Sequence, residues 1–267
     1  MFLFAGSLSA QTLPEPAQTL PEPARTLPVP VPPERADVDS PVPEAPESPV
    51  VSEKPLSPGI IHQLMLDEKA VYTSPLHIKK SDAKWLLPLT AATAFAFTKD
   101  QQISDQFDGH PSLQKKSLTF SQIGGPLATF GAAGGLMAIG KMTHNDHMAG
   151  TGLKGLEAVT LTQGLMHGIK LLTDRKRPGD GGNGGFWNGG DSFPSGHAME
   201  AWALATVVAS EYHNKPLVKF GMYGLAAAVS FSRMSAERHY ASDVLVGSAL
   251  GYLIGKFVVR QHPSTNN

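Results

Sequence analysis

The sequence predicts an all-α protein: a bundle of about six helices, preceded by a disordered, proline-rich N-terminal segment. Fourteen of the 22 prolines lie between Pro14 and Pro58, where they disfavour helices and inner strands. From about Ser57 onward, small and large apolar residues recur at helical spacing. The alternation of apolar and polar residues that marks a half-buried strand is scarce.

The chain of 267 residues divides into three expected parts. Residues 1–10 are apolar and end in small residues, which predicts a truncated signal peptide; a frayed terminus without a targeting role is the alternative. Residues 11–58 open with two copies of QTLPEPA, which predicts a solvated, disordered spacer rather than an SH3-type ligand. Residues 59–267 form the helical domain.

Composition excludes several classes of protein. A net charge of −1 argues against a nucleic-acid binder held by bulk positive charge. The chain has no cysteine, which excludes disulfide scaffolds, thiol catalysis and cysteine-based metal sites. The hydrophobic share of 41% is enough for a sizeable core.

Six stretches of the sequence, taken in chain order, are expected to form helices. Trp85–Thr98 is apolar and lies between two lysines. Ser117–Gly140 carries no charge but contains six glycines and Pro126. Apolar residues at three-to-four spacing continue in the remaining four stretches, 155–174, 197–213, 217–232 and 242–259.

The same stretches leave membrane insertion open. Only Ser117–Gly140 reaches the roughly 20 apolar residues that a spanning helix needs, so length favours a soluble or peripheral protein. Abundant glycine and alanine favour helix contacts inside a membrane instead. Charges that carry chemistry also interrupt the spans of membrane enzymes.

The first polar cluster reads KLLTDRKRP from Lys170 to Pro178. The proline predicts that the helix ends at Arg177. At helical spacing, Lys170 shares one face with His167, Asp174 and Arg177. A solvated, charged helix end is the alternative.

A glycine-rich segment follows, with seven glycines in the twelve residues before Asp191. We expect a flexible entrance loop, with Phe186 and Trp187 as candidates to line a substrate path. It is not a nucleotide-binding P-loop, because no G-K-[ST] follows. A plain surface loop is the alternative.

The second cluster is Pro-Ser-Gly-His at residues 194–197, directly before an apolar helical stretch. The exposed amides and positive dipole of a helix N-terminus make an anion site. Gly196 allows an oxyanion to approach the backbone, and Ser195 adds a hydroxyl donor. A simple helix cap with His197 as a bystander is the alternative.

The third cluster runs from Ser232 to Asp243. His239 and Asp243 are four residues apart, so in a helix the carboxylate can accept a hydrogen bond from one ring nitrogen. That bond fixes the tautomer and leaves the other nitrogen as a nucleophile or base. Arg233 offers a planar fork suited to phosphate oxygens. A surface pair of histidine and aspartate is the alternative.

Together the clusters follow the pattern K-x6-R-P, P-S-G-H and S-R-x5-H-x3-D at 11 positions. This set resembles the type 2 phosphatidic acid phosphatase and vanadium haloperoxidase superfamily. The resemblance covers residues 170–243 directly and extends over the helical region from about residue 80 to 260. The expected domain at 59–267 is accordingly a helical phosphatase domain. It implies a phosphate site formed by Lys170, Arg177, Ser195, Gly196 and Arg233.

The resemblance also implies the catalytic roles. His239 is the nucleophile that forms a phospho-histidine, Asp243 orients it, and His197 protonates the leaving oxygen. Neither a metal nor a cofactor is expected, because three cations and a helix N-terminus offset the charge of the phosphoryl group. His144 and His147 lack a third ligand nearby, so no metal site is expected there.

The implied function is a metal-independent phosphatase that hydrolyses a phosphate monoester or diphosphate of a lipid. The expected partners are a phosphorylated lipid or small phosphate ester and a membrane surface or bilayer, with no nucleic acid. The expected location is the cell envelope, with the site facing the periplasm or exterior. A soluble nonspecific acid phosphatase, a vanadate-dependent haloperoxidase and a non-catalytic anion-binding module are the alternatives.

These roles predict that His239→Ala or Asp243→Asn abolishes turnover, because each removes a group that the covalent step requires. The His167→Ala protein is expected to keep its activity, because His167 has no role in these steps. Phosphate release from purified variants measures both, and a fully active His239→Ala protein would contradict the mechanism.

Overall fold

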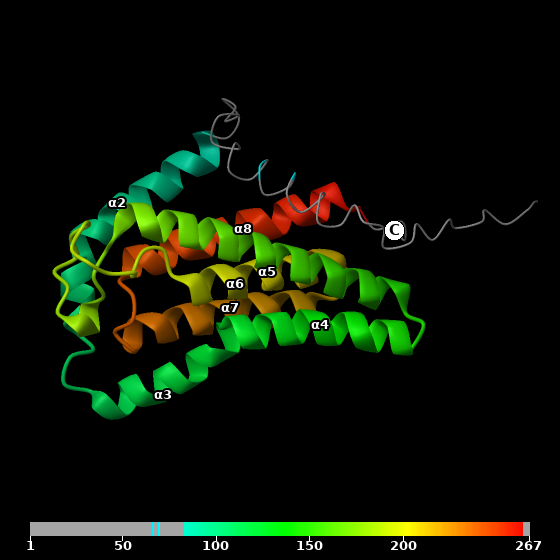
Figure 1. Ribbon diagram of the computed structural model, residues 1–267, viewed down its shortest axis with the longest axis horizontal. Coiled ribbons are helices and arrows are strands. Elements are labelled where there is room, and N and C mark those ends of the chain that lie inside the picture. The colour runs from blue at the N-terminus through cyan, green and yellow to red at the C-terminus, as the bar shows by residue number, and fades with distance from the viewer. Residues whose placement is uncertain (1–65, 67–68, 70–82, 264–267) are drawn as a thin grey trace, which may run out of the picture. The chain divides into compact units, whose positions relative to one another are not determined.

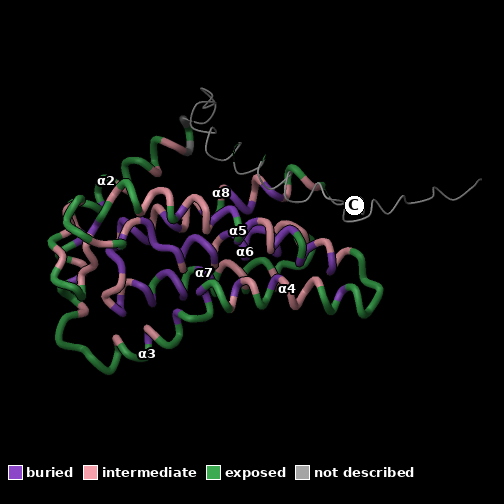
Figure 2. Tube along the Cα trace, in the orientation of Figure 1, coloured by how far each residue is buried: buried purple, intermediate pink, exposed green. Residues whose placement is uncertain are grey.

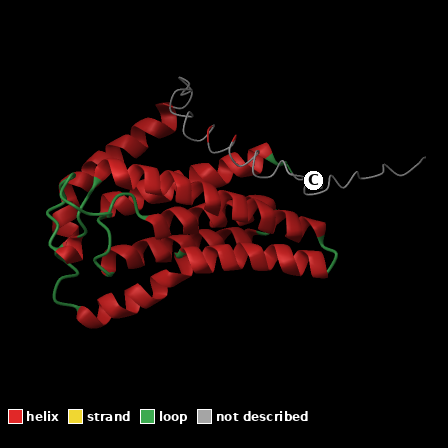
Figure 3. Ribbon diagram, viewed as in Figure 1, coloured by secondary structure: helices red, strands yellow, loops and turns green. Residues whose placement is uncertain are grey.

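Residues 83–263, with Leu66 and Lys69, are the part of the chain that the computed structural model describes. Within this part the protein is α-helical and has no strand, which confirms the predicted fold class (Figure 3). The expected signal-peptide remnant at 1–10 and the spacer at 11–58 lie outside the described residues.

The described chain folds into seven α-helices joined by loops and two short 3₁₀ turns (Figure 1). The helices α4 to α8 run along the long axis of the picture, and α3 diverges from them. Their bounds are α2 (Ala83–Ser104), α3 (Pro111–Ser121), α4 (Pro126–Met142), α5 (Asp146–Thr173), α6 (Gly196–Glu211), α7 (Pro216–Ser235) and α8 (Ala241–Gln261), and the turns are η3 (Gln122–Gly124) and η4 (Pro178–Asp180).

The helix α6 lies at the centre of the bundle and contributes to both parts of the apolar core. In one part, Met199 and Val207 of α6 pack against residues of α5 and α8, including Ile254. In the other, Leu204 of α6 packs with Ala133 of α4 and Val159 of α5. The buried stretches in Figure 2 follow these inner helices, whereas α3 is mostly exposed. The central helix is therefore held from several sides.

Glycines allow the backbones of α6 and α8 to touch. Gly247, Gly251 and Gly255 recur every fourth residue on one face of α8. A Cβ atom at Gly247 would lie 2.6 Å from the Ser195 carbonyl oxygen, and one at Gly251 would overlap the Met199 carbonyl. Since only glycine lacks this atom, these positions set the separation of the two helices.

Several predicted helix boundaries were wrong, among them the start of α5, which lies at Asp146 and not at residue 155. The stretch Ser117–Gly140 is divided by η3 and Pro126 into α3 and α4. The helix α5 ends at Thr173, not at Arg177, because Asp174 adopts a left-handed conformation with φ of 43°. The Asp174 carboxylate accepts hydrogen bonds from Gly189 N at 3.2 Å and Gly190 N at 2.9 Å, which ties the helix end to the glycine-rich loop.

Two segments of the described chain are long and apolar enough to cross a membrane: Pro111–Met142 and Ala241–Gln261. The first contains the single stretch that the sequence analysis judged long enough, and the second adds α8. Only 28% of the most apolar window of the first segment is buried inside the protein. Its outer face therefore presents apolar side chains, such as Leu127 and Met142, to the surroundings.

The glycine contact predicts that Gly251→Ala destabilises the bundle by roughly 1–3 kcal/mol, the cost of overpacking a close contact. The matched control is Gly221→Ala on α7, where an added Cβ meets nothing within 4 Å. This control is expected to stabilise the helix by up to about 1 kcal/mol. Thermal unfolding in detergent measures both, and equal effects would contradict the contact.

Candidate active site

The three motif clusters meet at one end of the bundle. The end of α5, the start of α6, the end of α7 and the start of α8 converge there (Figure 1). The positive charges of Lys170, Arg177 and Arg233 all lower the pKa values of His197 and His239. The cations and histidines that the sequence predicted as one site are therefore close enough to interact.

Two of the cations share an acidic partner that the sequence analysis did not identify. Lys170 lies in the last turn of α5, and Arg177 lies beyond the helix in extended backbone. The Asp191 carboxylate accepts from Arg177 Nη2 at 2.8 Å and from Lys170 Nζ at 3.5 Å. The expected common helical face does not exist at Arg177, and the loop brings the two cations together instead.

The third cation reaches the site from α7. Arg233 is buried, and its Nη1 donates to the Ser121 hydroxyl at 2.8 Å. A second bond joins the same two helices: the Ser235 hydroxyl donates to the Ser117 hydroxyl, also at 2.8 Å. These bonds between α3 and α7 hold the guanidinium in place.

The Pro-Ser-Gly-His motif opens α6 as predicted. Ser195 is the residue before the helix, but its hydroxyl makes no capping bond. Its amide donates to the Asp243 carbonyl at 3.1 Å, which joins the start of α6 to α8. A Cβ at Gly196 would overlap the Met166 sulfur, so a larger residue at the first turn would require the Met166 side chain to move.

The structure does not contain the expected hydrogen bond between Asp243 and the His239 ring. His239 precedes α8, and its Nδ1 lies 3.8 Å from Asp243 Oδ2. That nitrogen donates to the Ser192 carbonyl instead, at 2.6 Å. The Asp243 carboxylate accepts from the Ser192 hydroxyl at 2.5 Å and from Tyr240 N at 2.8 Å. Ser192 therefore lies between the two residues.

Both histidines are neutral at pH 7. Burial, reinforced by Arg233 and the other two cations, lowers the pKa of His239 well below its usual value. The same causes lower the pKa of His197 to about 4. Since Nδ1–H of His239 donates to a carbonyl, its Nε2 keeps a lone pair, which suits a nucleophile.

Several polar atoms of the site have no partner in the described protein. Four of the five buried side-chain atoms without a hydrogen bond belong to expected site residues: Arg177 Nε, Ser195 Oγ, His197 Nε2 and Arg233 Nε. Buried polar groups are nearly always hydrogen-bonded, so an unpaired cluster indicates a ligand. Two guanidinium donors and a hydroxyl beside a helix N-terminus suit a tetrahedral oxyanion.

The glycine-rich loop is tied down, unlike the flexible loop that its composition predicted. Trp187 N donates to the Thr173 carbonyl at 3.0 Å, and Gly184 N donates to the Tyr240 hydroxyl at 3.0 Å. Phe186 packs inward against Phe193 with ring centroids 5.4 Å apart, whereas Trp187 is exposed. The loop is therefore held against the end of α5 and the residue that precedes α8.

Sequence reasoning also missed the buried residues around Asp243. Arg175 bonds Asp243, Ser242 and, on α2, Asp100. The motif pattern does not specify Arg175, which stands among other charges between Lys170 and Arg177. No local signal connects Asp100 with α8, since the two lie far apart in the sequence.

Two other polar residues connect helices of the bundle. Glu200 on α6 is buried, and its carboxylate accepts from Thr129 Oγ1 at 2.9 Å and Gln163 Nε2 at 2.6 Å. It thereby ties α6 to α4 and α5. His147 lies 3.5 Å from Glu211 and against the ring of Tyr212.

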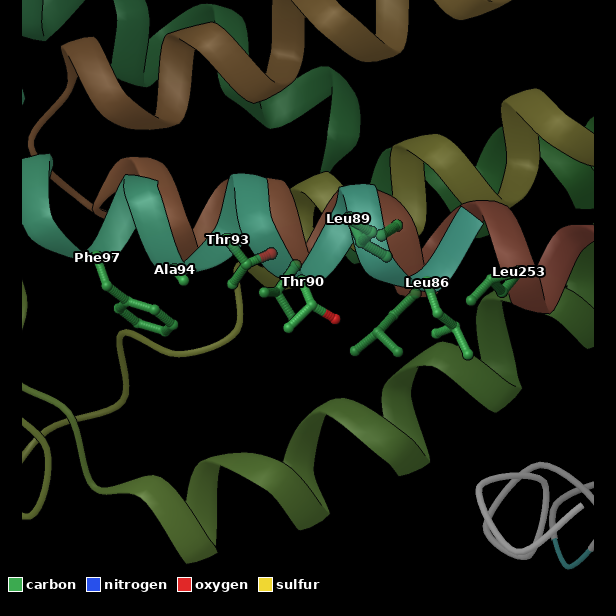
Figure 4. A pocket seen from close by; sticks show the side chains of 10 residues that line it. Leu86, Leu89, Thr90, Thr93, Ala94, Phe97 and Leu253 are labelled. Carbon is green, nitrogen blue, oxygen red and sulfur yellow. The ribbon is translucent and has the colours of Figure 1, made fainter. Parts of the chain in front are cut away.

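An apolar groove of about 350 Å³ lies between α2 and α8 (Figure 4). Leu86, Leu89 and Phe97 line it from α2, and Leu253 lines it from α8. None of the predicted catalytic or phosphate-binding residues lines this groove. The predicted site residues therefore lie apart from this groove.

The pKa of His197 predicts that acid destabilises the fold. An unfolded histidine binds a proton near pH 6.5, whereas His197 in the folded protein does so only near pH 4. Between these values the unfolded state holds more protons, so stability falls as the pH decreases. From pH 7 to 5 this loss amounts to about 2 kcal/mol for one histidine.

Unfolding in detergent at pH 7 and pH 5 tests this effect. His197→Gln cannot take up the proton in either state, so its loss of stability on acidification is expected to be smaller. An equal loss in both proteins would contradict the assignment to His197.

The chain is similar in sequence to known proteins. Residues 152–266 match the model of the PAP2 superfamily. The chain is 33% identical over 189 residues to the lipid A 1-phosphatase of Porphyromonas gingivalis. That match covers 67% of this chain but only 39% of the relative's length.

Two solved structures are also similar. A transmembrane PAP2-type phosphatidylglycerolphosphate phosphatase from Bacillus subtilis is 20% identical, with a TM-score of 0.49 over 77% of this chain and 98% of that one. Aquifex aeolicus LpxE is 22% identical, with a TM-score of 0.46 over 60% of this chain and 92% of that one. Both scores lie below 0.5, so the assignment depends on the family match and the curated relative. Through residues 152–266, the chain belongs to the PAP2 superfamily.

Proposed function

We propose that the chain is a metal-independent phosphatase that hydrolyses the phosphate of a lipid through a phospho-histidine. The unpaired donors of Arg177, Ser195 and Arg233 carry this proposal, because they are buried without hydrogen-bond partners and a phosphate group would satisfy them. Lys170 and the backbone of Gly196 complete the proposed phosphate site. Positive charge here comes from side chains and a helix N-terminus, so no metal is needed to balance the phosphoryl group.

In the first proposed step, the lone pair of His239 Nε2 attacks phosphorus, and the bond to the leaving oxygen breaks. His197, protonated in the complex with the dianion, donates its proton to that oxygen. The phosphate charge opposes the effect of the three cations and raises the low His197 pKa of the ligand-free protein. Asp243 holds the loop and helix start that carry His239.

In the second proposed step, neutral His197 takes a proton from a water molecule that attacks the phosphoryl group. The phosphorus–nitrogen bond breaks, inorganic phosphate leaves, and His239 recovers its lone pair. The cations stabilise the charge on the three equatorial oxygens in both steps.

We infer that the substrate is a phosphorylated lipid. The relative from Porphyromonas gingivalis is a lipid A 1-phosphatase, so a phosphate on a glycolipid is the first candidate. Large exposed apolar side chains support contact with lipid: Leu127 on α4 is 91% exposed, and Leu217 on α7 is 88% exposed. A phosphate monoester or diphosphate carried by another lipid fits the same donors.

We propose that the protein associates with a membrane through these apolar faces. Pro111–Met142 and Ala241–Gln261 have the length and composition to cross the bilayer. The proposed orientation places the active site toward the periplasm or exterior of the cell envelope, where such a phosphatase meets its lipids.

The test is phosphate release by detergent-purified protein in EDTA. The substrates are lipid A, phosphatidic acid, phosphatidylglycerol phosphate, a polyprenyl diphosphate and a soluble aryl phosphate. We expect one lipid phosphate to be hydrolysed faster than the aryl phosphate, and EDTA to leave the rate unchanged. His239→Ala is the inactive control, and His167→Ala, at an exposed position of α5, is the active control.

Other outcomes identify the alternatives. Equal rates on all substrates would indicate a nonspecific acid phosphatase. Loss of activity in EDTA would contradict the metal-independent mechanism. Halide oxidation supported by vanadate would indicate a haloperoxidase, and phosphate binding without hydrolysis would indicate a binding module.

A further inference from the structure

Arg175 is a fully buried cation that the proposed mechanism does not use. Its guanidinium lies between two carboxylates: Nη1 donates to Asp243 Oδ1, and Nη2 donates to Asp100 Oδ2 at 2.7 Å. Nε and Nη2 also donate to the Gly184 carbonyl at 3.1 and 2.8 Å. A buried charge with this many partners has one orientation.

Aromatic rings enclose the same guanidinium. Its central carbon lies 4.4 Å from the ring centroid of Tyr240, 4.9 Å from that of Phe186 and 5.2 Å from that of Phe97. These rings keep water away, which strengthens the ion pairs. Lysine, with a compact charge and no planar fork, would not reproduce both bridges.

Asp100 connects this cation to the helix that carries Asp243. Its carboxylate is 2% exposed and accepts from Ser242 N at 2.9 Å and from the Ser242 hydroxyl. Ser242 lies in the first turn of α8, where backbone amides lack partners within the helix. Asp100 therefore fixes the turn that carries Asp243 from the opposite helix, α2.

Ser192 extends the connection to His239. Its hydroxyl donates to Asp243 Oδ2 at 2.5 Å, and its carbonyl accepts from His239 Nδ1 at 2.6 Å. The Ser192 amide donates to the Arg175 carbonyl at 2.7 Å. Arg175 thus holds Ser192 by its backbone and holds Asp243 by its side chain.

We infer that Arg175 and Asp100 are positioning residues for the nucleophile, acting on His239 through Asp243 and Ser192. The inference depends on the proposed function, in which His239 attacks phosphorus. Neither residue contacts the phosphate-binding donors in the described structure, so the effect is on the angle and position of the ring. The region matched to the family begins at residue 152, so the inference makes α2, outside that region, part of the support of the active site.

The test compares Arg175→Lys and Asp100→Asn in the full chain, purified in detergent, with dioctanoyl phosphatidic acid as substrate. We expect kcat to fall roughly 10- to 100-fold, the cost of misplacing a reacting group by about an ångström. KM and the inhibition constant of orthovanadate are expected to change less than about threefold, because the anion donors remain. Ser192→Ala leaves every charge in place and is expected to lower kcat in the same way.

Glu211→Gln is the matched control for a purely structural role. It breaks another buried ion pair, between Glu211 and Lys154 Nζ at 2.8 Å, which joins α6 to α5 away from the motif clusters. We expect a lower melting temperature with an unchanged kcat. A loss of kcat in Arg175→Lys and Asp100→Asn no greater than in this control would overturn the inference, as would a change in KM alone.

The failure of this inference is distinct from the failure of the proposed function. An inactive His239→Ala protein combined with fully active Arg175→Lys and Ser192→Ala proteins would reject only the positioning role. A fully active His239→Ala protein would reject the phospho-histidine mechanism and the positioning role together. If Arg175→Lys does not fold, Ser192→Ala and Asp100→Asn decide the outcome.

Discussion

The backbones of α6 and α8 touch, and the site depends on this contact. Gly247 packs on the backbone of Ser195, and Ser195 N donates to the Asp243 carbonyl. A side chain at Gly247 would push the start of α6 away from α8. Because the second motif opens α6 and the third motif ends in α8, this contact places the amides of the proposed phosphate site beside His239, the proposed nucleophile.

The same end of the bundle collects positive charge. Lys170, Arg177 and Arg233 converge there, and two helices begin there, whereas the acidic partner of the first two cations, Asp191, is more than half exposed. The low pKa values of both histidines follow from this charge and from burial. A site of this kind holds its histidines neutral and favours a phosphate dianion.

Negative charge in the site lies behind the nucleophile. Asp243 and Asp100 face Arg175, and none of the three is exposed by more than 2%. The cation between the two buried carboxylates offsets the repulsion that they would otherwise exert on each other. His239 thus lies between the cations of the proposed anion site and the neutralised ion cluster of Asp243, Arg175 and Asp100.

Local patterns predicted the helices because apolar periodicity extends over a few turns of one segment. They failed where a distant partner decided the conformation. The Asp174 carboxylate accepts from two amides of the glycine-rich loop, and this ended α5 before the predicted position. The spacing of His239 and Asp243 suggested a direct bond, but Ser192 entered between them from another segment.

The sequence by itself determined the helical class, which follows from composition and periodicity. Through the order of its motifs, which resembles that of a known family, it also predicted the residue types of the site: three cations, two histidines, an aspartate and a helix start with Ser195 and Gly196. Only the tertiary structure decided how the residues are connected, through Asp191, Ser192, Arg175 and Asp100. A buried group bonds the partner that packing brings within about 3 Å. The spacing of residues along the chain does not specify that partner.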